Sequence, residues 1–161
     1  MSRFDKHFRL HEADVIEYAK EKLDIFDKYA QLQCEEIGDG NINYIFRVWD
    51  EETGKSVIIK HADIELRDTP GRLLSTDRSW IEAEILELQG KLAPDLVPKI
   101  YKYDPIMCCL TMEDLSDHEN LRYALIQHKM FPQLADDITT FMVNTLLMTT
   151  DALISPKKKK K

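Results

Sequence analysis

The sequence predicts an α+β fold in which five antiparallel strands form one sheet, with a single crossing helix after the third strand. Three observations predict it. Three short apolar runs that alternate with polar residues lie between residues 32 and 61, a helical stretch follows over 77–89, and two more strand-like runs fill 97–112. Because tight turns join the neighbouring runs, we expect them to pair in antiparallel fashion.

Composition limits what the chain can be. Its 161 residues leave room for one ordinary domain, or for one lobe of a larger protein. With 43% hydrophobic and 32% charged residues, a soluble globular chain is expected. The net charge of −7 argues against nucleic acid as the main partner. Since we find no signal-peptide pattern and no apolar run of membrane-spanning length, we expect a cytoplasmic protein without a membrane partner.

The three cysteines predict no metal site. Cys34, Cys108 and Cys109 lie in strand-like apolar runs, and neither CxxC nor a His–Cys spacing occurs. Reduced, buried thiols are therefore expected.

Residues 1–30 are expected to form an N-terminal arm and a helix. Residues 1–9 look like a polar arm. Residues 11–23 predict an amphipathic helix, because Val15, Tyr18 and Ala19 share one face. No residue of this helix indicates a catalytic or ligand-binding role.

Residues 36–46 predict a strand, a tight turn and a second strand. Gly38 and Gly40 in the turn tolerate backbone conformations that other residues avoid. A turn without bulky side chains lets backbone amides approach phosphate oxygens closely. The alternative is a plain β-hairpin.

A lysine closes the third strand, which covers residues 56–61. Lys60 beside a glycine-rich turn is the arrangement that kinases use to hold nucleotide phosphates. In such a lobe, a carboxylate of the crossing helix aims the lysine, and Glu82 and Glu84 are the candidates. The alternatives are a surface lysine on an edge strand and two solvated glutamates.

The crossing helix is expected over residues 77–89, ended by Gly90. We assign its apolar side to five residues: Trp80, Ala83, Ile85, Leu86 and Leu88. Strands at 97–104 and 106–112 then lead to residues 112–116, which end the sheet and pass into a helix. A two-lobed kinase places its hinge at such a point, and backbone groups there could pair with an adenine edge. A helix from about Glu119 and a long apolar helix over 132–153 follow.

This order of elements is that of a protein-kinase-like amino-terminal lobe, expected over residues 31–115. Residues 116–161 would then begin a second lobe. The runs 36–44, 81–84, 97–101 and 112–118 closely resemble the S-methyl-5-thioribose kinase family, as does the run 145–151. The resemblance extends from about residue 12 to the end of the sequence.

That family phosphorylates the 1-hydroxyl of 5-methylthioribose with ATP and Mg²⁺ in methionine salvage. The resemblance implies that Asn43 contacts the nucleotide and that Lys60 holds its phosphates, with Glu82 preferred to Glu84 as its partner. It also implies an adenine hinge, and homodimers are an expectation for the full-length family. The nucleotide-binding residues predicted in this way are Gly38, Gly40, Asn43, Lys60, Glu82, Glu113, Asp114 and Leu115.

Two departures from the family are visible. Residues 68–74 replace a Gly-Glu-Ser-Trp-Pro-Leu type of loop, so contacts of that loop are not carried over. The catalytic aspartate, the Mg²⁺ ligands and most of the thioribose site belong to the family's second lobe. We therefore expect this chain to contain no catalytic residue and to bind ATP without kinase activity, with methylthioribose bound only when the second lobe is present.

Two alternatives stay open. The chain could instead be a non-catalytic remnant or interaction module with a kinase-like lobe. The five lysines at 157–161 could bind an anionic partner, or could be the solvated end of a helix.

Overall fold

The structure is a computed structural model that describes residues 2–38, 42–69 and 71–150. The chain divides into two compact units, one of residues up to 87 together with 98–114, the other of residues 88–97 and the chain from 115 onward. The expected division into residues 1–30, 31–115 and 116–161 stays a prediction. None of the helices in the described part is long and apolar enough to cross a membrane.

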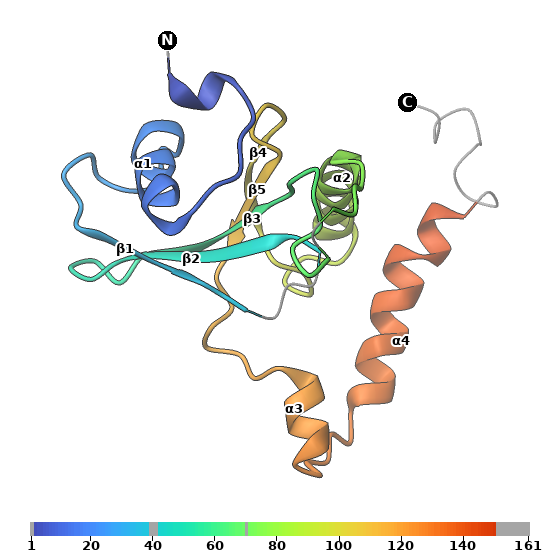
Figure 1. The fold of residues 1–161 in the computed structure, drawn as a ribbon. Helices are drawn as coiled ribbons and strands as arrows, with labels where there is room; N and C mark the ends of the chain where they lie inside the picture. The colour runs from blue at the N-terminus through green and yellow to red at the C-terminus, as the bar shows by residue number, and fades with distance from the viewer. Residues whose placement is uncertain (1, 39–41, 70, 151–161) are drawn as a thin grey trace. The chain divides into compact units, whose positions relative to one another are not determined.

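The first unit is built on a five-stranded sheet with the order β1-β2-β3-β5-β4 (Figure 1). All neighbouring strands are antiparallel, which confirms the expected α+β class and sheet. The tight turn between the second and third strands closes at Gly54, whose φ of 69° favours glycine. The strands are β1 (Leu32–Glu36), β2 (Tyr44–Asp50), β3 (Ser56–His61), β4 (Ile100–Asp104) and β5 (Cys109–Glu113).

The N-terminal segment covers one face of this sheet. It contains a short 3₁₀ helix, η1 (Arg3–Asp5), and the helix α1 (Glu12–Lys22), close to the predicted range. The prediction of a polar arm over residues 1–9 is wrong, because Phe4 is fully buried and packs edge-on against Tyr18. Apolar side chains of β2 and β3 complete this core, namely Phe46, Val48, Val57 and Ile59.

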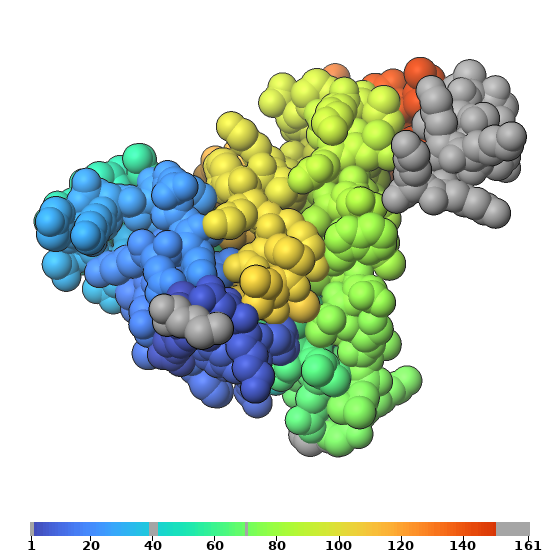
Figure 2. Space-filling model, turned by 90° about the horizontal axis from the view of Figure 1, so that it is seen from above, coloured from blue at the N-terminus to red at the C-terminus, as the bar shows by residue number. Residues whose placement is uncertain are grey.

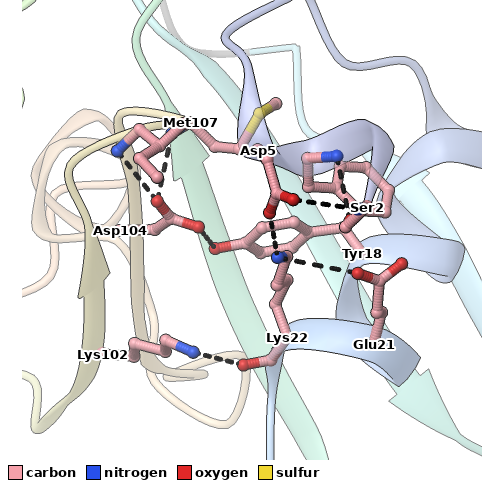
Figure 3. A network of polar contacts seen from close by, with 10 residues as sticks. Ser2, Asp5, Tyr18, Glu21, Lys22, Lys102, Asp104 and Met107 are labelled. Atoms are coloured by element: carbon pink, nitrogen blue, oxygen red, sulfur yellow. Dashed lines mark hydrogen bonds and ion pairs between the residues drawn. The ribbon is translucent and has the colours of Figure 1, made fainter.

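A polar network fastens α1 to the turn between β4 and β5 (Figure 3). The Tyr18 hydroxyl donates to Asp104 Oδ2 over 3.0 Å, and burial raises the pKa of this hydroxyl far above its usual value. Asp104 Oδ1 accepts the amides of Ile106 and Met107. Figure 2 shows the result, with the blue N-terminal segment lying against the yellow β4–β5 segment.

The fourth strand starts at Ile100 instead of residue 97, and the same network explains why the fifth strand starts later than predicted. Because Asp104 binds two amides of the following residues, the chain turns there instead of entering a strand at Ile106. The strand β5 begins at Cys109, after Cys108 adopts a φ of 50°. All three cysteines are free, and two are buried as expected, whereas Cys34 is half-buried.

The helix α2 (Asp77–Leu92) packs against the opposite face. Side chains alternate along a strand, so Val57 and Ile59 face the α1 side while Ile58 and Lys60 face α2. Ala83 of α2 contacts a second apolar cluster that includes Leu110 and Met112.

Two predictions for this helix are wrong. It continues past Gly90, because Ala93 still donates to the Gln89 carbonyl over 2.7 Å; a glycine inside a helix costs only about 1 kcal/mol relative to alanine. Of its predicted apolar side, Ala83 is buried and Leu86 partly buried. Trp80, Ile85 and Leu88 are 42–48% exposed, because the small residues Ser79 and Ala83 face the sheet instead.

The second unit contains α3 (Leu121–Ile126), α4 (Leu134–Thr145) and the 3₁₀ helix η2 (Leu147–Thr149). The predicted helix near Glu119 begins two residues later because Asn120 caps it, accepting the Arg122 amide over 2.9 Å. The predicted helix over 132–153 is shorter, since tighter 3₁₀ hydrogen bonds follow Thr145. Residues 151–153 and the five terminal lysines lie outside the described residues.

Candidate functional site

Lys60 and Glu82 form an ion pair between the sheet and α2. Lys60 lies on β3, opposite Ile45 of β2 and Leu110 of β5. Its Nζ is 2.6 Å from Glu82 Oε1, with side-chain exposures of 25% and 32%. Glu84 points to solvent. The structure thus pairs the strand lysine with the first of the two candidate glutamates, and both charges stay accessible to a ligand.

The strands β1 and β2 form an antiparallel hairpin, and the glycine-rich stretch lies between them in the sequence. The Ile37 amide continues the ladder past β1 by donating to the Ile45 carbonyl over 2.7 Å. Gly38 follows at the end of this stem, and a side chain there would meet nothing within 4 Å. Asn43 stands directly before β2 and is 7% exposed. Gly40 lies outside the described residues, and the nucleotide-binding role of all three stays a prediction.

Two arginines hold the stems of this hairpin, and the sequence analysis missed both. Arg67 pairs with Glu36 over 2.8 Å and donates to the Gly38 carbonyl over 2.9 Å. Arg78 donates from Nε to Asn43 Oδ1 over 2.8 Å. Of the two, only Arg78 could have been found from the sequence. It lies four residues, about one helical turn, before Glu82 and therefore on the same face of the predicted helix. Arg67 lies in a loop without a repeating pattern.

The predicted hinge starts at the end of β5. The Glu113 amide donates to the Lys99 carbonyl over 2.8 Å, and its carboxylate accepts the Lys99 amide. The Asp114 carboxylate, 3% exposed, binds Arg47 Nε over 2.7 Å and so fastens the end of β5 to β2. These two side chains are therefore engaged within the first unit.

Leu115 is the first residue of the second unit after β5. Its carbonyl accepts the His118 amide over 2.9 Å. Its own N–H forms no hydrogen bond with any residue that the structure describes. The contact of Leu115 with an adenine edge stays a prediction.

Magnesium has no evident site in the described part of the chain. Over residues 2–38, 42–69 and 71–150, no group of three or more His, Cys, Asp or Glu side chains is arranged to hold a metal ion.

Fold and site together define an α+β chain with a strand lysine paired to a carboxylate of the crossing helix. No family model matches the sequence. It is 38% identical over 141 residues to the methylthioribose kinase of Bacillus pumilus, covering 86% of this chain and 35% of that protein. The corresponding protein of Bacillus velezensis is 39% identical over 140 residues, with the same two coverages. That of Bacillus thuringiensis is 36% identical over 156 residues, covering 96% of this chain and 39% of that protein.

These relatives confirm the predicted resemblance to methylthioribose kinases. The chain spans little more than a third of the length of the curated relatives that it matches, 35–39%.

Proposed function

We propose that this chain forms the ATP-binding lobe of a small-molecule kinase resembling methylthioribose kinase, which phosphorylates the 1-hydroxyl of 5-methylthioribose in methionine salvage. The observation that carries the proposal is the 2.6 Å pair between Lys60 of β3 and Glu82 of α2. Kinases hold nucleotide phosphates with a third-strand lysine that a helix carboxylate aims. The homology to methylthioribose kinases supports the same conclusion.

Each predicted residue then has a physical task. The Lys60 ammonium supplies positive charge to the phosphates, and Glu82 restricts where that ammonium can lie. The hairpin with Gly38, Gly40 and Asn43 offers polar hydrogens to phosphate oxygens. The backbone of Glu113, Asp114 and Leu115 pairs with the adenine edge.

The remaining parts of the reaction belong outside these residues. Phosphoryl transfer needs Mg²⁺ and a carboxylate that positions the nucleophile. We assign the Mg²⁺ ligands, this carboxylate and the methylthioribose site to the part of the related kinases that this chain does not match. The 161 residues alone then bind ATP without transferring its phosphoryl group. Cytoplasmic location, homodimer formation and the absence of nucleic-acid and membrane partners stay predictions.

Calorimetric titration with magnesium-ATP tests the proposal on the chain itself. Lys60→Ala should weaken binding about tenfold or more, because a charged hydrogen bond contributes about 1.5–3 kcal/mol. Lys55→Ala is the matched control, since Lys55 is an exposed lysine in the turn that precedes β3 and its removal should leave the affinity unchanged. Absence of ATP binding by the folded wild-type chain would overturn the proposal and favour the interaction-module hypothesis.

A further inference from the structure

Arg78 connects α2 to the glycine-rich hairpin through a single side chain of that hairpin. It is the second residue of α2, and its Nε donates to Asn43 Oδ1 over 2.8 Å. Asn43 is only 7% exposed, so its side chain has little freedom to turn. The contact therefore ties the position of the hairpin to that of the helix.

This contact also fixes which way the Asn43 amide points. A guanidinium group can only donate hydrogen bonds, so the atom facing Arg78 must be the amide oxygen. The amide nitrogen then points away from Arg78, and it has no hydrogen-bond partner among the described residues. Asn43 thus holds two oriented N–H donors that the described part of the protein does not use.

The other nitrogens of Arg78 bind both ends of the preceding loop. Nη2 donates to the Asp63 carbonyl over 2.7 Å, and Nη1 donates to the carbonyls of Leu74 and Ser75. All four acceptors of Arg78 are neutral oxygens, and no carboxylate of the described ranges lies within ion-pair distance of it. Unlike the ammonium of Lys60, this guanidinium forms no direct ion pair with a carboxylate of the described residues, although the nearby Asp63 carboxylate favours its charged form.

Arg78 and Glu82 lie one helical turn apart on the same face of α2. Glu82 holds Lys60 of β3, and Arg78 holds Asn43 at the start of β2. One face of α2 therefore positions two groups that the proposed phosphate site would use, the ammonium of Lys60 and the side-chain amide of Asn43.

We propose that Arg78 is a positioning residue for nucleotide phosphates. It holds the Asn43 amide so that its two N–H donors meet a phosphate oxygen. This inference rests on the proposed function, since it names a further component of the same ATP site.

A double-mutant cycle on magnesium-ATP affinity tests the link between the two residues. Asn43→Ala and Arg78→Ala should each weaken binding about tenfold. If Arg78 acts through Asn43, the two losses should not add. The double variant should then have nearly the same magnesium-ATP affinity as the single variant that binds less tightly. Arg72→Ala is the matched control, because Arg72 is an exposed arginine of the same loop whose side chain makes no hydrogen bond or ion pair with the described residues. Additive losses, or equal effects of Arg78→Ala and Arg72→Ala, would overturn the inference.

A charge-preserving variant and a spectroscopic readout cover the case in which Arg78→Ala does not fold. Arg78→Lys keeps the charge but lacks the planar fork that binds four oxygens. The side-chain amide resonances of Asn43, assigned by their loss in Asn43→Ala, should shift in Arg78→Lys and also when ATP is added to the wild type. Unchanged resonances and affinity in Arg78→Lys would contradict the inference.

Failure of the two proposals can be told apart. If the wild-type chain binds no ATP, the proposed function fails and this inference fails with it. If ATP binds and Lys60→Ala weakens it while Arg78→Ala does not, only the role of Arg78 is overturned.

Discussion

At the residue scale, His61 is the titratable group whose burial has the clearest consequence. It ends β3, and its Nδ1 lies 3.0 Å from the Met107 carbonyl. A carbonyl only accepts, so Nδ1 carries the proton, and the buried Nε2 has no hydrogen-bond partner among the described residues. The His61 ring stacks on His7. Burial, and then the charge of His7, lowers the pKa of His61 to about 4.

This buried histidine should destabilise the fold in mild acid. In the unfolded chain a histidine has a pKa of about 6.5, so between pH 6.5 and 4 the unfolded state binds more protons than the folded state. Stability should therefore fall as the pH falls, by about 2 kcal/mol from His61 between pH 7 and 5. Urea unfolding at the two pH values should show that loss in the wild type and a smaller one in His61→Asn. The exposed His118, changed to Asn, is the control, and an equal loss in the wild type and in both variants would contradict the assignment.

The residue scale also shows where sequence interpretation stops. Lys60 could be predicted because strand alternation and the glycine-rich turn fix its place. Glu82 and Glu84 could not be separated, because α2 carries two possible inner faces. The more apolar one, with Ile81 and Ile85, faces solvent, while the smaller residues Ser79 and Ala83 meet the sheet. Close packing against a sheet can favour small side chains over hydrophobic ones, and single-sequence hydropathy cannot detect that.

At the element scale, the N-terminal arm is part of the core. Phe4 is fully buried and stacks on Phe8, while Arg3 pairs with Asp14 and Glu17 of α1. The strands were predictable from alternation over five to seven residues, whereas η1 has only three residues and shows no period. The contribution of η1 to the core depends on tertiary contacts, and a local sequence pattern does not reveal these.

Truncating Phe4 should therefore be costly. Phe4→Ala should lower the free energy of unfolding by about 3–5 kcal/mol, because it removes a buried aromatic ring and leaves a cavity. Tyr29→Ala removes an aromatic ring that is 83% exposed and should change stability by no more than about 0.5 kcal/mol. Denaturant unfolding of both variants measures the difference. Similar small effects would mean that the arm does not belong to the core in solution.

At the scale of the whole molecule, the two units differ in how much side-chain burial holds their helices. The helix α1, of 11 residues, buries Val15, Tyr18 and Ala19. The helix α4, of 12 residues, has Thr145 as its one buried residue among those described. Ile138, Met142 and Val143 of α4 are all close to half exposed. Helices in proteins draw most of their stability from tertiary packing, so two helices of nearly equal length should differ in local stability.

Hydrogen exchange should resolve this difference within one sample. The amides of β3, which pairs with β2 and β5, should exchange only through global unfolding. Those of α1 should be nearly as slow, because α1 packs into the same core. Those of α4 should exchange faster, through local opening that leaves the sheet intact. Equal protection of α1 and α4 would show that the apolar side chains of α4 are covered in solution. If the protection of the α4 amides is then lost on dilution, a second copy of the chain covers these side chains, since only association depends on concentration.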